Sequence, residues 1–277
     1  MMEFPLLPRS AHADITRLAR KKYRLAEKKV VLEGARLIAD VIDEAPGAIA
    51  LCVVDASKID RYADILARMQ SNGVDVFATS ERVMSRLGGT VSPQGILAVA
   101  SFSTLAPSDA AARAADGGVS VGLVGVADPG NLGTVIRTCD WFGVSALFLT
   151  GGCVEPTNPK VVRSTMGSLF RVPLAAASSP QEILSAVRTR GLTIVAAVGS
   201  GGSPPGEIGW EKPLLVFLGS EAHGLPGEIL SAADITVTIP GRGGAESLNV
   251  AVAHGILLYH LSTLPWKRRS PSPFDHP

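Results

Sequence analysis

Short apolar runs and amphipathic stretches alternate along almost the whole chain. Continuous apolar runs such as residues 48–54 and 214–218 are typical of strands buried on both faces of a parallel sheet. Apolar residues spaced three or four apart are typical of helices that pack against such a sheet. The pattern therefore predicts an α/β protein.

The first third of the chain predicts a small mixed α/β domain. Its expected helices are residues 13–29, 35–44, 61–71 and 80–87, and its expected strands are residues 48–55, 74–78 and 95–102. Two of these helices end at pairs that favour turns, Pro46-Gly47 and Asn72-Gly73.

The remainder of the chain alternates strand and helix, which predicts a second domain with a parallel sheet covered on both faces. The expected strands are residues 119–126, 144–150, 171–175, 193–198, 214–218 and 235–239. The expected helices are residues 132–142, 160–170, 180–190, 224–232 and 246–264. Residues 103–118 are rich in Ala, Ser and Asp, which favours a linker. We therefore expect domains at 1–105 and 119–265, a linker at 106–118 and a flexible tail at 266–277.

Composition narrows the class of protein. Of 277 residues, 46% are hydrophobic and 18% are charged, which excludes a mainly disordered chain. No apolar run approaches the ~20 residues that cross a bilayer, and the N-terminus lacks the apolar region of a secretory signal, so we expect no membrane partner. Cys52, Cys139 and Cys153 are odd in number and widely spaced, which favours buried thiols in a reducing cytoplasm.

The net charge is only +1, but the charges are unevenly distributed and a basic segment lies near the N-terminus. Residues 9–29 hold eight basic residues against Asp14 and Glu27, and a second basic group occupies 267–269. Such blocks can contact phosphates. A solvated helix face explains the same pattern, and charge alone favours that explanation.

Candidate chemistry lies in the loops after the strands, because open α/β sheets bind ligands beyond the carboxyl ends of their strands. Asn131 and Arg137 follow the strand at 119–126, where a helix cap and a surface cation are the simpler interpretations. Glu221, between Gly219 and Gly224, follows the strand at 214–218, and glycine there would permit close backbone approach to a ligand.

The last strand leads into a loop that also carries polar residues. Ser247 and Asn249 stand at the start of the final helix, where capping is again the simpler interpretation. Other familiar motifs are missing: the dinucleotide fingerprint GxGxxG after the first strand of the second domain, the phosphate loop GxxxxGK[ST] and the nucleophile elbow GxSxG. The five histidines form no pair with metal-ligand spacing, so we expect no metal site.

Three exit loops taken together resemble the motifs of one enzyme family. Asn131-x-Gly133 with Arg137 resembles motif 1 of the SpoU/TrmH branch of the SPOUT RNA methyltransferases. Leu218-Gly219-Ser220-Glu221-x-x-Gly224-Leu225 resembles motif 2, and Ile239-Pro240 followed by Glu246-Ser247-Leu248-Asn249-Val250-Ala251-Val252-Ala253 resembles motif 3. Residues 10–103 are similar to the small domain that binds substrate in many SpoU enzymes, through Lys21-Lys22-Tyr23-Arg24 and Val31-Leu32-Glu33-Gly34.

The resemblance implies a fold and a reaction. Such domains contain a deep trefoil knot, bind S-adenosylmethionine, assemble as homodimers and methylate a ribose 2′-hydroxyl of RNA. It implies that Gly219, Ile239 and Leu248 bind the cofactor, largely through backbone groups, and that Ala197 and Val198 line its adenine side.

The resemblance also implies roles for the polar loop residues. Arg137 is either the base that accepts the hydroxyl proton or a cation that stabilises the developing alkoxide. The residues expected to orient Arg137 and the ribose are Asn131, Glu221, Ser247 and Asn249. The residues expected to contact RNA are Arg163 and, in the basic segment, Arg20, Lys21, Lys22 and Arg24.

The extra N-terminal domain favours ribosomal RNA over transfer RNA as the substrate. A transfer-RNA methyltransferase and a non-catalytic knotted RNA-binding protein remain alternatives. Retention of all the polar motif residues argues against the non-catalytic protein. An unrelated Rossmann-like oxidoreductase is a third alternative, and the missing dinucleotide fingerprint argues against it.

Overall fold

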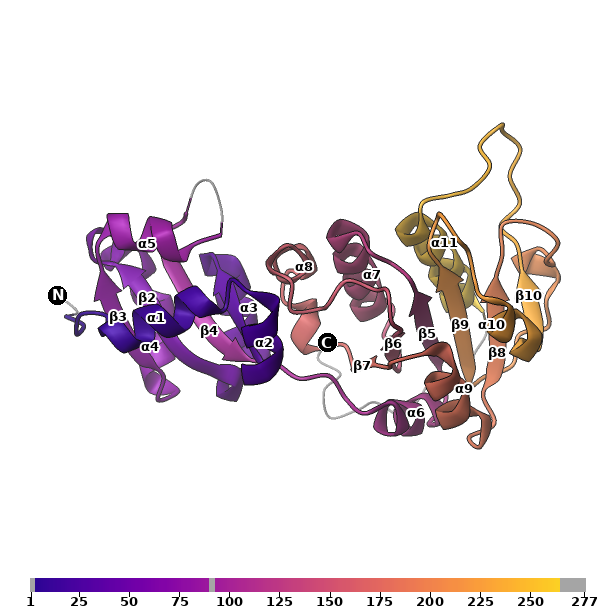
Figure 1. Ribbon diagram of the computed structural model, residues 1–277, viewed down its shortest axis with the longest axis horizontal. Helices are drawn as coiled ribbons and strands as arrows, with labels where there is room; N and C mark the ends of the chain where they lie inside the picture. The colour runs from indigo at the N-terminus through magenta and orange to yellow at the C-terminus, as the bar shows by residue number, and fades with distance from the viewer. Residues whose placement is uncertain (1–2, 90–92, 265–277) are drawn as a thin grey trace. The chain divides into compact units, whose positions relative to one another are not determined.

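A computed structural model describes residues 3–89 and 93–264 of the chain. The expected tail and the basic group at 267–269 therefore lie outside the described residues. The chain forms two compact units (Figure 1). Unit 1 comprises Met1–Ser103 together with Leu132–Arg137 and Glu155–Arg171, and unit 2 comprises Thr104–Asn131, Thr138–Val154 and Val172–Pro277. Among the described residues, no helix is both long enough and apolar enough to cross a membrane.

Unit 1 is built on a four-stranded mixed sheet in the order β1-β4-β2-β3. Its strands are β1 (Lys29–Glu33), β2 (Ile49–Asp55), β3 (Asp75–Thr79) and β4 (Ile96–Ser101). Its helices are α1 (Arg9–Arg17), α2 (Lys21–Glu27), α3 (Ala35–Glu44), α4 (Ala63–Ser71), α5 (Glu81–Leu87) and α8 (Pro159–Thr165). Ile15 and Leu18 pack against Val53, Leu97 and Val99 of the sheet, so burial holds α1 on the strands.

The single helix predicted at residues 13–29 is wrong. The chain forms α1 and α2 with a break between them, and α2 ends where Lys28 adopts a left-handed conformation with φ of 52°. Strand β1 follows at once, with Val30 and Leu32 buried and paired to β4. The alternating burial of these five residues is typical of a strand. It was missed because the basic residues directly before β1 favour a helix, and the expected helix was extended into the strand.

Unit 2 contains a six-stranded sheet in the order β10-β8-β9-β5-β6-β7, and every pairing in it is parallel, as predicted. Its strands are β5 (Val119–Val124), β6 (Leu147–Leu149), β7 (Leu174–Ala176), β8 (Thr193–Ala197), β9 (Leu214–Gly219) and β10 (Ile235–Val237). Its helices are α6 (Pro107–Ala115), α9 (Pro180–Arg188), α10 (Gly227–Ala232) and α11 (Val250–Thr263), and α7 (Pro129–Trp141) follows β5. Figure 1 shows α9 in front of this sheet and α11 behind it.

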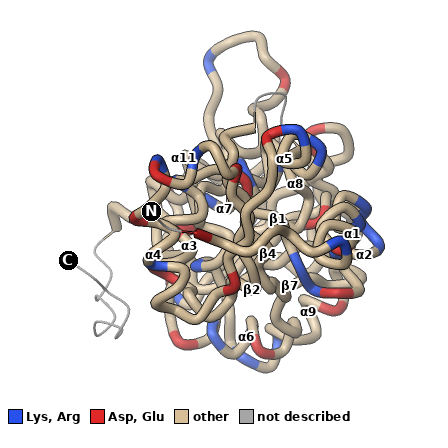
Figure 2. The backbone as a smooth tube through the Cα atoms, turned by 90° about the vertical axis from the view of Figure 1, so that its left-hand side faces the viewer, with Lys and Arg blue, Asp and Glu red and all other residues tan. Residues whose placement is uncertain are grey.

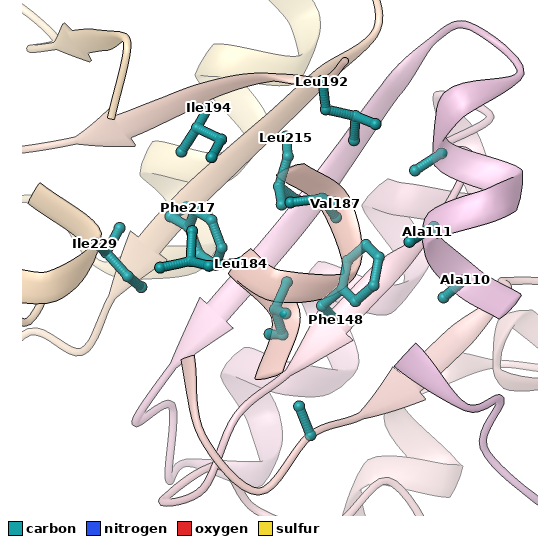
Figure 3. Packing of buried hydrophobic residues seen from close by; sticks show 14 of the residues in the cluster. Ala110, Ala111, Phe148, Leu184, Val187, Leu192, Ile194, Leu215, Phe217 and Ile229 are labelled. Atoms are coloured by element: carbon teal, nitrogen blue, oxygen red, sulfur yellow. The ribbon is translucent and has the colours of Figure 1, made fainter. Parts of the chain in front are cut away.

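The segment predicted as a linker contributes to the core of unit 2. Residues 107–115 form α6, and Ala110, Ala111 and Ala114 are fully buried. Figure 3 shows the first two facing a cluster that includes Phe148 and Val187. Alanine-rich composition suits a helix that packs closely on a sheet as well as it suits a linker, so composition alone could not distinguish them.

The helix predicted at residues 160–170 is shorter than expected. Helix α8 ends at Thr165, because Met166 and Gly167 are both left-handed, with φ of 48° and 87°. A 3-10 turn, Ser168–Phe170, follows. Glycine tolerates that conformation and methionine rarely adopts it, so the break is fixed by the surrounding structure.

Candidate active site

The carboxyl end of β5 leads directly into α7, and Asp128 caps this helix. The Asp128 carboxylate accepts a hydrogen bond from the backbone N–H of Asn131 at 2.8 Å, and Pro129 occupies the first helical position. The suggestion that Asn131 is the cap is therefore wrong. Asp before Pro is the sequence signal that identifies the true cap, and the interpretation of Asn131 overlooked it. Because Asp128 caps the helix, the Asn131 side chain remains available for other partners.

Glu221 gathers Asn131 and Asn249 into one hydrogen-bonded cluster, although the three residues come from separate segments of the chain. Its Oε1 accepts from Asn131 Nδ2 at 2.9 Å, from Asn249 Nδ2 at 3.2 Å and from the backbone N–H of Val250 at 3.2 Å. Asn249 Nδ2 also donates to Asn131 Oδ1 at 3.0 Å. The structure thus brings together one predicted residue from each of the three motifs, and we call this set the Glu221 cluster.

Asn249 also caps α11, so the functional and the capping interpretations both hold for it. Its Oδ1 accepts from the backbone N–H groups of Ala251 and Val252 at 3.0 and 3.3 Å. With Oδ1 used by the helix, Nδ2 is directed to Glu221 and Asn131. Three N–H donors therefore converge on the Glu221 carboxylate, one of them from the backbone at the start of α11.

Gly219 ends β9, and the absence of a side chain there is required by the loop itself. A Cβ built on Gly219 would lie 2.0 Å from the carbonyl oxygen of Gly224 and 2.7 Å from the backbone nitrogen of Leu225. The loop is closed by a hydrogen bond from the N–H of Gly224 to the carbonyl of Ser220 at 2.9 Å. The glycine therefore lets the loop that carries Glu221 fold back on its own strand.

The segment between β10 and α11 is exposed and extends beyond the sheet (Figure 1). Within the described chain, none of residues 240–248 has a hydrogen bond or an ion pair. Ser247 is exposed and lies outside the Glu221 cluster, and the Leu248 side chain is 45% exposed. The backbone donors and acceptors of this loop are consequently open to a bound molecule.

Arg137 is exposed on α7, six residues after Asn131. Among the described residues it has no hydrogen-bond or ion-pair partner. An exposed guanidinium of this kind is suited to binding an anion or stabilising developing negative charge.

Two family models match the chain. Residues 118–259 match the SpoU rRNA Methylase family, and residues 13–98 match the MRM3-like substrate binding domain. The first of these matches spans just over half of the chain. The chain belongs to the SpoU rRNA methylase family. This membership confirms the predicted family and the prediction that the protein is a methyltransferase. The parallel-sheet domain and the preceding α/β domain confirm the predicted fold class, and the trefoil knot stays a prediction.

Relatives and solved structures agree with this SpoU assignment. The chain is 32% identical over 250 residues to the 23S rRNA (guanosine(2553)-2′-O)-methyltransferase RlmP of Bacillus subtilis, covering 90% of this chain and 94% of that protein. It is 36% identical over 136 residues, 47% of each chain, to a 23S rRNA (uridine(2479)-2′-O)-methyltransferase of Streptomyces viridochromogenes. An AdoMet-bound rRNA methyltransferase from Sinorhizobium meliloti superimposes with a TM-score of 0.81 at 31% identity, covering 94% of this chain and 97% of that one.

The residues predicted to bind the cofactor lie at neighbouring strand ends of unit 2. Ala197 pairs in register with Val237, and the N–H of Val198 donates to the Val237 carbonyl at 2.9 Å, so the ends of β8 and β10 lie together. The end of β9 is next to them, because β8 and β9 are neighbours and Ala196 pairs with Phe217. Ala197, Val198, Gly219 and Ile239 are half-buried there. Small apolar surfaces beside open backbone groups suit an adenosine.

The residues predicted to contact RNA divide into accessible and inaccessible groups. Arg20, Lys21 and Lys22 are exposed at the start of α2, and Figure 2 shows Lys and Arg concentrated along α1 and α2. Arg24 is only 4% exposed, and its guanidinium donates to the carbonyls of Leu18 and Ala19 at 3.0 and 2.8 Å. The inclusion of Arg24 among the RNA contacts is therefore not supported, because a guanidinium buried to this extent cannot reach a phosphate.

Arg163 lies on α8 and is half-buried. Its Nη1 would be 3.5 Å from a Cβ placed on Gly89, and no hydrogen-bond or ion-pair partner is found for it among the described residues. Its guanidinium is thus available to a phosphate, as the sequence predicts. Glu155, which precedes α8, accepts from Arg24 and was not singled out by the sequence, because a single acidic residue in a loop carries no motif.

Proposed function

We propose that this protein transfers the methyl group of S-adenosylmethionine to a ribose 2′-hydroxyl of ribosomal RNA. The observation that carries the proposal is the Glu221 cluster, in which Asn131, Glu221 and Asn249 meet at the loops that follow the parallel strands. The family of the chain, the names of its relatives and the fit of the strand ends to an adenosine support the same reaction.

The bound cofactor supplies an electrophilic methyl group on a sulfonium. The cofactor would be held at the strand ends by Ala197, Val198, Gly219 and Ile239, and in the loop before α11 by Leu248. When the cofactor is bound, that methyl group would pass from the sulfonium sulfur to the ribose oxygen, and the hydroxyl proton would leave to solvent or to a substrate phosphate. A guanidinium stays charged in proteins, so Arg137 acts as a cation that stabilises the developing alkoxide.

The Glu221 cluster has a positioning role in this reaction. It fixes the loop after β9 to the first turns of α7 and α11. The end of the segment around Ser247 and Leu248 that joins α11 is thereby held in place. Holding the hydroxyl in line with the methyl group supplies much of the rate acceleration, because two reactants held in the reactive orientation react as one molecule does and no longer depend on chance collision.

A substrate assay tests the proposal directly. Purified protein with radiolabelled S-adenosylmethionine should label ribosomal RNA that lacks the modification, and nuclease digestion should release a 2′-O-methylated nucleoside. A parallel reaction with transfer RNA tests the alternative that the protein methylates transfer RNA. Label on a base, label only in transfer RNA, or no label at all would contradict the proposal in three distinguishable ways.

We also infer that the protein acts as a homodimer, in the cytoplasm where its RNA substrate resides. Val252, Ile256 and Tyr259 form an exposed apolar stripe on α11, with side chains 50%, 40% and 64% exposed. Trp141 at the end of α7 is 84% exposed, and its neighbour Phe142 lines the same cavity as Leu258 of α11. Contiguous apolar surface of this kind suits a self-association interface.

A further inference from the structure

Arg24 and Glu155 form a buried ion pair that joins the basic helix α2 to the segment leading into α8. The exposed fractions of the two side chains are 4% and 13%. The Arg24 guanidinium donates to Glu155 Oε1 as well as to the carbonyls of Leu18 and Ala19 in the turn between α1 and α2. One guanidinium thus holds both the turn before α2 and the carboxylate. A pair so removed from water is costly to break, because each partner would leave an uncompensated charge behind.

Hydrogen bonds continue from Glu155 into α8. The backbone N–H of Asn158 donates to the Glu155 carbonyl at 3.0 Å. The Asn158 side chain then caps α8 by accepting from the N–H of Lys160 at 2.9 Å. Because each link is hydrogen-bonded, the placement of α8, and of Arg163 on it, depends on where Glu155 is held.

Both basic elements lie on one part of unit 1. Helices α2 and α8 each pack against β1. Lys21 Nζ is 3.7 Å from Glu155 Oε2 while its side chain stays 62% exposed, so one α2 cation already lies beside the segment that leads to Arg163. The exposed Arg20 and Lys22 flank Lys21. The cations of α2 and the guanidinium of Arg163 are therefore candidates for one continuous phosphate-binding surface.

We propose that Arg24 and Glu155 are positioning residues for RNA binding, which hold Arg20, Lys21 and Lys22 of α2 and Arg163 of α8 as a single phosphate-binding surface. Neither member of the pair contacts RNA. The inference rests on the proposed function, since it takes RNA as the substrate. It assigns a role in recognition to two residues that lie outside the three methyltransferase motifs.

Glu155→Gln distinguishes this positioning role from a simple charge effect, because the two explanations predict opposite changes in RNA affinity. Removing a negative charge from beside Lys21 should strengthen RNA binding if electrostatics alone acts. Loss of the ion pair should weaken RNA binding if the pair positions the surface. We expect the KM for ribosomal RNA to rise by about tenfold and the slope of binding against salt to fall by about 0.7 for each phosphate that the variant no longer neutralises. The kcat at saturating RNA and the affinity for S-adenosylmethionine should stay within about twofold of wild type.

Asp43→Asn is the matched control. Asp43 on α3 forms an ion pair with Arg68 in the same unit, so this variant loses the same charge and one ion pair. Because Asp43 is 66% exposed, its pair is solvated, and RNA binding should stay equal to wild type or become slightly tighter. Arg24→Lys is a second variant that keeps the charge but loses the planar fork that bridges three acceptors, and it should reproduce the effect of Glu155→Gln.

Measurements are made below the thermal transition of each variant, so that only folded protein is compared. Wild-type KM and salt slope in folded Glu155→Gln and Arg24→Lys would overturn the inference, as would a fall in kcat with KM unchanged. Failure of the proposed function is distinct, because wild-type protein would then not methylate the ribose at all. If wild type is active and Glu155→Gln behaves like Asp43→Asn, only the positioning role is refuted.

Discussion

Arg137 is the residue that carries the chemistry of the proposed reaction. Arg137→Ala should reduce methyl transfer by about a hundredfold or more, because removing a group that stabilises transition-state charge costs that much. Affinity for S-adenosylmethionine, measured by calorimetry, should be nearly unchanged, since Arg137 lies on α7 and not in the cofactor loops. Wild-type turnover in this variant would exclude Arg137 from catalysis.

Arg137→Lys then distinguishes between the two roles considered for this side chain. A lysine keeps the positive charge but loses the planar fork. Substantial recovery of methyl transfer over Arg137→Ala would support charge stabilisation, whereas no recovery would favour a specific geometric or proton-accepting role. Arg113→Ala, at an exposed site on α6, is the control for loss of a surface cation.

Gly219 gives the second test at the scale of single residues. We predict that Gly219→Ala lowers the free energy of unfolding by about 1–3 kcal/mol, because its Cβ would overlap the backbone at Gly224. Cofactor affinity should fall by at least tenfold, since the displaced loop carries Glu221. Gly227→Ala is the matched control, because a Cβ there meets nothing within 4 Å. Equal stability and affinity in the two variants would show that the close approach is unimportant.

At the scale of elements, α11 carries a histidine that makes stability depend on pH. His254 is fully buried, its Nε2 lies 3.5 Å from Cys139 Sγ, and burial lowers the pKa of its ring from 6.5 to about 3. The unfolded chain takes up a proton below about pH 6.5 while the folded protein does not. Stability is therefore full above pH 6.5 and falls by about 1.4 kcal/mol for each pH unit down to about pH 3.

His254→Leu should remove this dependence. Free energies of unfolding from denaturant titrations, collected between about pH 7 and about pH 5, should show a smaller slope in the variant than in wild type. Because the substitution also changes packing, the slope is the informative quantity and the absolute stability is not. Identical slopes would show that other groups produce the acid sensitivity.

The basic helix pair α1–α2 is the element expected to set RNA affinity. Replacing Arg20, Lys21 and Lys22 with Gln, and leaving the buried Arg24 intact, should weaken RNA binding and lower the salt slope by about 0.7–0.9 for each phosphate left without its cation. Cofactor binding should be unaffected. A triple replacement with the same charge change at the exposed Arg113, Arg188 and Arg190 is the control. Equal salt slopes in filter-binding titrations of the two variants would identify the segment as a solvated helix face.

The accuracy of sequence-based prediction differed between these elements for physical reasons. Helix α3 has the bounds that the sequence predicts, because Pro46 and the apolar spacing define it. The α1–α2 break and β1 were missed, because they depend on the burial of Leu18 and on pairing with β4, about seventy residues along the chain. The motif residues could be named in advance, whereas the Glu221 cluster and the Arg24–Glu155 pair depend on contacts between distant segments.

At the scale of the whole molecule, the apolar stripe on α11 predicts the oligomeric state. Tyr259→Glu combined with Val252→Glu should convert a dimer into a monomer, because charges at the centre of an apolar interface are desolvated without partners. Sedimentation velocity measures the change directly. Leu230→Glu, at an exposed leucine on α10, is the control and should leave the dimer intact. A wild-type monomer, or a double variant that remains dimeric, would contradict the assignment of this surface.

The strand order of unit 2 also governs how the newly made chain can fold. Strand β5 is the first of the sheet to be synthesised, yet its pairing partner β9 begins at Leu214, ninety-five residues after Val119. The β5–β9 pair therefore cannot form until most of the domain has left the ribosome, and the edge of β5 on the side away from β6 stays unpaired until then. Such long-range pairing is slow and exposes strand edges to aggregation, so truncation before residue 214 should leave a chain that needs chaperones to stay in solution.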